Sequence, residues 1–180
     1  MRTVNRTWIV RAVAVALLLG AVTATAAEAG WWSEYVTDES SLPAEVQEVV
    51  LEALLGPEGE YAAHATYAAI IDEYGRVNPF VNIMASEAKH IEALQRILDR
   101  YGIAYPENPY LGEVDAPGSL AEAAQAGVDA EIANVALYER QLATAADHPD
   151  ILEVFLNLQT ASQESHLPAF QRAVSRYAGS

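Results

Sequence analysis

Cysteine is missing from this chain of 180 residues. Its absence excludes disulfide bonds, thiolate metal sites, iron–sulfur clusters and a rubredoxin-type electron-transfer module. It also excludes lipid attachment at a cysteine. Any metal ion that the protein binds must therefore be held by oxygen and nitrogen ligands, which suit iron, manganese or zinc.

Basic residues are scarce as well. The chain has 10 Lys and Arg against 25 Asp and Glu, which gives a net charge of −15. Nucleic acids require a basic footprint on their protein partners, so we expect no nucleic-acid binding, and the same charge argues against anionic membrane surfaces. An acidic surface suits solubilisation, attraction of cations, a basic partner or a high-salt habitat.

The chain has no uncharged run as long as the roughly 20 residues of a membrane span. Near the N-terminus, three arginines precede 16 uncharged residues (12–27), with Ala-x-Ala cleavage patterns at 24–26 and 27–29. Residues 1–29 are therefore predicted to be a signal peptide, with an uncleaved anchor as the alternative. Cleavage would give an exported protein (periplasmic, secreted or at the cell surface) without a stable membrane span. Its net charge would move from −15 to −17, because three bases and one acid are lost.

Strand-like alternation is also absent, and the remaining sequence predicts an all-α protein. Residues 30–41 are a polar, aromatic segment that we expect to be a flexible leader. Proline at helix starts and glycine just past helix ends divide residues 42–180 into helical runs. The predicted runs cover 42–55, 57–74, 79–101, 119–146 and 148–177. The four longer runs predict a four-helix bundle with a short extra N-terminal helix, and 103–118 forms a long connection.

The third run carries the most informative pair of residues, Glu87 and His90. Their spacing of three places both side chains on one helix face, and that face is otherwise apolar, with residues such as Phe80, Leu94 and Leu98. A carboxylate and an imidazole in an apolar stripe are costly unless something pairs with them. A metal ion is the simplest partner, because Glu-x-x-His is used by carboxylate-bridged di-metal bundles.

Each of the other long runs also has a candidate ligand in its apolar stripe. These candidates are Glu60 in the run 57–74, Glu131 in the run 119–146 and His166 in the run 148–177. Four helices that each direct such a residue inward are much less expected by chance than one motif. The alternative is a polar network in the core that binds no metal.

Three further residues are left open as members of the site. His64 lies one helical turn after Glu60. Its role is left open as a ligand, a hydrogen-bond partner or a core histidine. Gln163 precedes His166 by three residues and would be a neutral, poorer ligand. Glu164 faces away from His166 on a regular helix, unless the bend expected at Pro168 forms a local bulge that turns it inward.

Three other polar residues are expected near the candidate ligands. Tyr67 and Tyr138 fall in apolar stripes, where they pack in the core and can hydrogen-bond a buried carboxylate. Asn134 lies one turn beyond Glu131 and can orient the ligands by hydrogen bonds without contacting the metal itself.

Four segments resemble the ferritin-like superfamily: 58–67, 78–90, 127–131 and 157–170. Among its members, the chain is most similar to a small bacterial and archaeal family of ferritin-like domains of unknown function, a rubrerythrin-like bundle without the rubredoxin module. The resemblance covers about 57–177, and the segment containing Glu87 and His90 is its most specific part.

The resemblance implies a set of metal ligands. Ferritin-like di-iron sites use a Glu, a Glu-x-x-His, a Glu and a second Glu-x-x-His from successive helices. Carried over to this chain, these roles fall on Glu60, on Glu87 with His90, on Glu131 and on His166. Glu87 and Glu131 would bridge two ions. The fourth glutamate is replaced by Gln163, so a single ion or a weaker second one becomes credible.

The implied function is metal binding, with ferroxidase or peroxide-scavenging chemistry if the metal is redox-active iron. The contrasting hypothesis is a metal-free helical scaffold that acts through its acidic surface. In such a scaffold three buried glutamates should make the protein more stable as pH falls, because protonation removes the cost of burying their negative charge. The oligomeric state is left open, with a homodimer among the alternatives.

Overall fold

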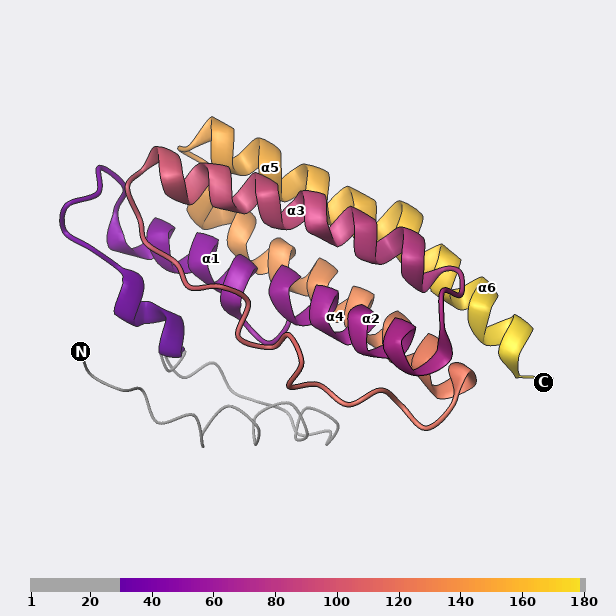
Figure 1. The fold of residues 1–180 in the computed structure, drawn as a ribbon. Coiled ribbons are helices and arrows are strands. Elements are labelled where there is room, and N and C mark those ends of the chain that lie inside the picture. The colour runs from indigo at the N-terminus through magenta and orange to yellow at the C-terminus, as the bar shows by residue number, and fades with distance from the viewer. Residues whose placement is uncertain (1–29, 179–180) are drawn as a thin grey trace, which may run out of the picture.

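The computed structural model describes residues 30–178, so the predicted signal peptide lies outside the described residues (Figure 1). Within this range the chain is helical and has no strand, which confirms the all-α prediction. None of the helices in the described part is long and apolar enough to cross a membrane. The helices are α1 (Ala44–Leu55), α2 (Glu60–Tyr74), α3 (Phe80–Arg100), α4 (Leu120–Ala145), α5 (Pro149–Ala161) and α6 (Leu167–Tyr177).

Two short segments complete the secondary structure. A 3-10 turn, η2 (Trp31–Tyr35), precedes α1, and a π-helical segment, η3 (Ser162–His166), joins α5 to α6. The predicted runs match the helices closely, except that 148–177 is one run with η3 inside it. Helix ends follow local chemistry: Gly75 and Gly102 end α2 and α3 with φ of 81° and 68°, a conformation that glycine adopts without steric cost.

The helices form a bundle of four rows (Figure 1). The rows are α1 followed by α2, then α3, then α4, and then α5 with η3 and α6. The segment between α3 and α4 runs back along the length of the bundle, so α3 and α4 point the same way. The predicted connection over 103–118 is thus a crossover rather than a tight turn.

α1 corresponds to the short extra N-terminal helix predicted from the sequence. It lies in line with α2 and contributes Val50, Leu51 and Leu54 to the core, where these side chains have no exposed surface. The break between the two helices includes Gly59, where an added Cβ would lie 2.4 Å from the carbonyl oxygen of Ala53. The first row is therefore one helical path interrupted by a glycine-dependent bend.

The segment 30–41, predicted to be flexible, contacts α1 through specific hydrogen bonds. The Thr37 amide donates to Gln47 Oε1 at 2.9 Å, and Gln47 Nε2 donates to the carbonyl oxygens of Thr37 and Leu42 at 2.9 and 2.8 Å. Ser33 Oγ donates to Glu48 Oε2 at 2.9 Å. Gln47 is buried, so these bonds satisfy its amide inside the fold.

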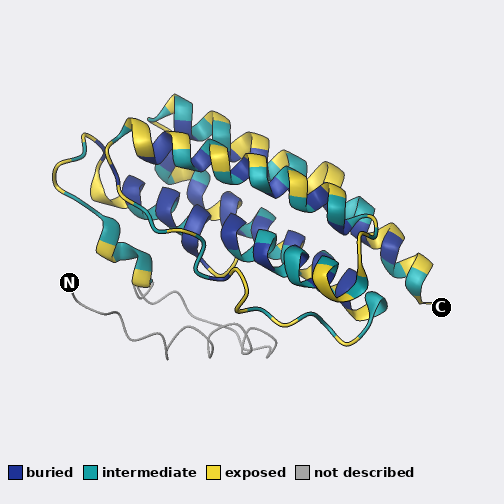
Figure 2. Cartoon of the chain, viewed as in Figure 1, coloured by how far each residue is buried: buried dark blue, intermediate teal, exposed yellow. Residues whose placement is uncertain are grey.

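Two apolar clusters make up the core, and buried faces line the inside of every row (Figure 2). The larger cluster contains Leu94, Leu98, Phe155 and most of α1, and the smaller one contains Phe80 and Phe170. Along α3, the residues between Ile83 of the smaller cluster and Leu94 of the larger one include two buried polar side chains. A polar layer therefore separates the two clusters.

Candidate metal centre

The polar layer consists mainly of the residues predicted as ligands. Glu60 opens α2, Glu87 and His90 lie on α3, Glu131 lies on α4, and His166 ends η3. All five side chains are buried, with exposed fractions between 1% for Glu60 and 7% for His90. Residues separated by more than 100 positions in the sequence are thus gathered in one place.

Glu60, Glu87 and His90 form a first group. His90 Nδ1 lies 2.8 Å from Glu87 Oε2 and 3.3 Å from Glu60 Oε2. One ligand atom from each residue lies within 4.8 Å of the others, which is close enough for a shared metal ion. The Glu-x-x-His pair on α3 therefore converges with the first residue of α2.

Glu87, Glu131 and His166 form a second group with the same spacing limit of 4.8 Å. His166 Nδ1 lies 3.1 Å from Glu87 Oε1 and 3.4 Å from Glu131 Oε2. Glu87 thus belongs to both groups and directs one oxygen toward each. The rings of His90 and His166 stack with centroids 5.4 Å apart, one beside each oxygen of Glu87.

Hydrogen bonds from neighbouring residues hold the carboxylates in place. The Tyr138 hydroxyl donates to Glu60 Oε1 at 2.6 Å, and the Tyr67 hydroxyl donates to Glu131 Oε1 at 2.9 Å. Asn134 Nδ2 also lies 3.4 Å from Glu60 Oε1. These contacts confirm the roles expected for the tyrosines and Asn134, and such bonds orient ligands in metal sites.

Replacing Tyr138 with phenylalanine tests this support. The change removes the donor to Glu60 but keeps the packed ring, so the metal-free protein should lose about 1–3 kcal/mol of unfolding free energy. Affinity for a divalent ion should fall about 10–100-fold, because the carboxylate loses its fixed orientation. Thermal unfolding and metal titration measure the two effects. Tyr105→Phe, which removes an exposed bond to Asp99, is the matched control and should change neither quantity.

The π-helical segment decides which residues of the fourth row face the site. Ser162 and His166 are buried, whereas Gln163 and Glu164 are exposed. The Leu167 amide donates to the carbonyl oxygen of Ser162, an i to i+5 bond that widens the turn. In a regular helix both Ser162 and Gln163 lie near the face of His166, and the wider turn keeps Ser162 on that face and turns Gln163 away from it.

Ser162 was missed as a partner of the site by reasoning from the sequence. Its hydroxyl donates to Asn134 Oδ1 at 2.9 Å, and Asn134 Nδ2 in turn donates to the Glu58 carbonyl oxygen at 3.1 Å. This chain of bonds ties η3 to the start of α2, where Glu60 lies. The fourth row thus contributes one ligand-type residue, His166, and one residue that supports the site through Asn134.

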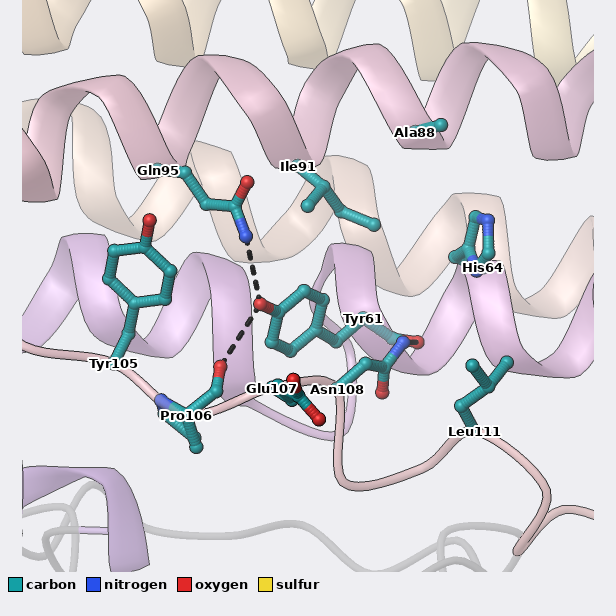
Figure 3. A pocket seen from close by; sticks show the side chains of 10 residues that line it. All are labelled: Tyr61, His64, Ala88, Ile91, Gln95, Tyr105, Pro106, Glu107, Asn108 and Leu111. Atoms are coloured by element: carbon teal, nitrogen blue, oxygen red, sulfur yellow. Dashed lines mark hydrogen bonds between the residues drawn. The ribbon is translucent and has the colours of Figure 1, made fainter.

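His64 lies outside both groups. Figure 3 shows where its side chain lies instead. It lines a pocket of about 390 Å³ formed by α2, α3 and the crossover segment, together with Tyr61, Gln95 and Leu111. Partial burial lowers the pKa of His64 below its ordinary value, because it disfavours the charged imidazolium. The open alternative that His64 is a ligand is therefore not supported by its position.

The two site histidines are held in the charged form by the carboxylates. Burial is the largest influence and lowers the pKa of His90, but hydrogen bonds and charges from Glu60 and Glu87 outweigh it and raise this pKa to about 10. The pKa of His166 rises to about 9, because Glu131 and Glu87 outweigh its burial in the same way. Without a metal, both rings carry a proton at neutral pH.

Glu60 and Glu87 shift in opposite directions. Burial and the charge of Glu60 raise the pKa of Glu87 to about 7. Burial also acts to raise the pKa of Glu60, but hydrogen bonds and charge from His90, with donation from Tyr138, lower it to about 2. We expected protonation of every buried glutamate to stabilise the metal-free fold. This expectation is wrong for Glu60, because His90 stabilises its charged form.

The donor set fits a divalent metal ion. Three carboxylates and two imidazoles are the hard and intermediate ligands that iron, manganese and zinc accept. Among residues 30–178, no lysine or arginine side chain is buried, so no ammonium or guanidinium group neutralises the three carboxylates inside the site. His166 Nδ1 is buried without a hydrogen bond of good geometry, although two carboxylate oxygens lie within 3.4 Å. An ion would use this nitrogen.

Comparison with known proteins gives one match. The sequence model of a family described as "Uncharacterized protein domain (DUF2202)" matches residues 52–179, which include all five candidate ligands. No curated protein and no solved structure matches the chain significantly. The match covers most of the chain and runs from the end of α1 through α6. The protein therefore belongs to the DUF2202 family of uncharacterized domains.

Proposed function

We propose that this protein is an exported, ferritin-like metal-binding protein that holds iron in its core, with manganese or zinc as alternative ions. The observation that carries the proposal is the pair of buried groups, Glu60–Glu87–His90 and Glu87–Glu131–His166, which share one carboxylate. Ligands come from all four rows in the order Glu, Glu-x-x-His, Glu, His. That order supports ferritin-like membership, which the sequence resemblance suggested.

The carboxylate ligands have different roles in binding. Glu87 lies between the two positions and is suited to bridge them, whereas Glu60 and Glu131 each belong to one group. Glu131 was expected to bridge, and its place in one group favours a terminal role instead. Tyr138 and Tyr67 fix the outer carboxylates by hydrogen bonds. Burial of all five ligands, none more than 7% exposed, limits the contact of the site with bulk water.

The charge balance favours one tightly held ion and a weaker second one. Three carboxylates offset three of the four positive charges of two divalent ions. The residue that would supply a fourth carboxylate in the resemblance is Gln163, and its side chain is exposed. Bound iron would supply ferroxidase or peroxide-scavenging chemistry, and the chain's own part is to bind it, orient it and exclude water.

A metal-free scaffold is the second candidate function, and one observation favours it. The protonated rings of His90 and His166 already balance two of the three carboxylates, and the raised pKa of Glu87 lets the third stay partly neutral. The polar layer is thus nearly neutral without a metal. In that case the protein would act through its acidic exterior, and no divalent ion would stay bound.

Metal content separates the two candidates. We would incubate residues 30–180 anaerobically with Fe(II), Mn(II) or Zn(II), desalt the protein and measure bound metal by elemental analysis. We expect between one and two equivalents of iron per chain. Gln163→Ala and Glu153→Ala change exposed residues of the fourth row and should leave this number unchanged. Metal-free wild-type protein after all three incubations would overturn the proposal in favour of the scaffold.

A further inference from the structure

A second pocket, of about 380 Å³, leads to the candidate metal centre between α2 and α4. At the outside it is lined by the exposed residues Pro57, Glu58 and Asp129. Its lining also includes the buried residues Tyr67, Glu131 and Asn134. The pocket with His64 contains no candidate ligand. Of these two pockets, only the one between α2 and α4 has a proposed ligand, Glu131, in its lining.

Small residues create the space between the two helices. On α4, Ala126, Ala130 and Ala133 follow one face at spacings of four and three. Gly59 and Ala63 oppose them at the start of α2. All but Gly59 are half-buried, and none has atoms beyond Cβ that could fill the gap. Any larger side chain at these positions would narrow the passage.

The pocket reaches one of the two proposed metal positions through its ligand Glu131. Glu131 lines it and belongs to the second group, with Glu87 and His166. Each group has one carboxylate of its own, and the second group differs in that His166 Nδ1 lacks a hydrogen bond of good geometry. Glu60, Glu87 and His90 of the first group do not line the pocket. An exogenous ligand arriving this way therefore meets the Glu131 position first.

The chemistry of the lining selects small uncharged molecules. Between the mouth and the buried polar residues, the walls consist largely of alanine, which offers no partner for an ion. Both acids at the mouth are engaged: Glu58 pairs with Arg140 at 2.9 Å, and Asp129 accepts from Gln125 at 2.9 Å. Their negative charge disfavours anions, and their pairing weakens attraction for cations.

From this geometry we infer that the α2–α4 pocket is the entrance through which a small uncharged oxidant, dioxygen or hydrogen peroxide, reaches the Glu131–His166 position. The inference rests on the proposed function, because it requires a metal in the site. It adds a direction of approach, through the face lined by Ala63 and Ala130, and it assigns the Glu131–His166 position to the incoming molecule.

Closing the passage tests the inference. Fe(II)-loaded protein would be mixed anaerobically with nitric oxide, a small uncharged probe, and the association rate followed by the absorbance of the iron–nitrosyl product. Ala130→Leu should slow association at least about tenfold while bound iron stays at the wild-type level. Ala88→Leu, in the pocket with His64, is the matched control and should leave the rate unchanged.

Several outcomes would overturn the inference. One is an unchanged rate in Ala130→Leu with full iron content. Another is slower Fe(II) uptake without slower nitric oxide association, which would make the passage a cation route. If Ala130→Leu fails to fold, Ala63→Val on the opposite helix serves instead, with the same expected slowing. Wild-type protein that binds no iron would instead refute the proposed function itself.

Discussion

Replacing Glu87 with alanine should reduce bound iron from between one and two equivalents to almost none. Glu87 is the residue common to both ligand groups, so its loss leaves each group with one carboxylate and one histidine. Two ligands of that kind do not hold a divalent ion through desalting. Loss of either Glu60 or Glu131 should be milder, because each belongs to one group.

The matched control for this change is Glu92→Ala. Glu92 lies on the same helix, is exposed and pairs with Arg96 at 3.7 Å, a surface contact that contributes little to stability. Circular dichroism should show that both variants remain helical, and Glu87→Gln keeps the volume of the side chain if the alanine variant unfolds. Full iron content in the Glu87 variants would contradict a shared bridging carboxylate.

Metal affinity should rise steeply with pH. Metal binding must displace the proton from each imidazole, and the pKa values of about 10 for His90 and about 9 for His166 keep both protonated throughout pH 6–8. Each ion therefore releases at least one proton, so its Kd should fall about tenfold per unit of pH. Titration with Mn(II) in buffers of different ionisation enthalpy measures the affinity and the proton count together. A flat profile would mean that the histidines are not ligands.

The free energy of unfolding of the metal-free protein should fall as pH rises, whereas metal affinity increases. The pKa values of His90, His166 and Glu87 are all raised, so their contribution is complete below the unfolded values of 6.5 and 4.5. It is lost as pH rises through about 7, 9 and 10. Glu60, with its pKa lowered to about 2, loses its contribution only below pH 4.5. The stabilisation that bound metal adds should therefore increase from pH 6 to pH 9.

Much of the fold could be predicted because its helix boundaries are set locally. Glycine at positions 75 and 102 and proline at 149 terminate or start helices by backbone geometry alone, and the structure ends α2 and α3 and begins α5 there. The inward ligands followed from helical periodicity, since a carboxylate or imidazole in an apolar stripe is visible in the sequence. This reasoning found Glu60, Glu131 and both site histidines.

The features of the site that could not be predicted depend on tertiary structure. Helical periodicity places both Ser162 and Gln163 near the face of His166, and only the π-helical turn at η3 shows that Gln163 is turned outward and exposed. The sequence indicated a bend near Pro168 without fixing its form. Likewise, only the three-dimensional arrangement shows that Glu87 lies between two histidines. Whether His64 turns toward the ligands was also undecidable from one helix.

The most direct test of the account is anomalous X-ray diffraction from crystals of residues 30–180 loaded anaerobically with Fe(II) and measured at the iron absorption edge. The account predicts a strong peak among Glu60, Glu87 and His90 or among Glu87, Glu131 and His166, and two peaks sharing Glu87 if both positions fill. No anomalous peak at these residues, or iron bound only at surface acids, would contradict it.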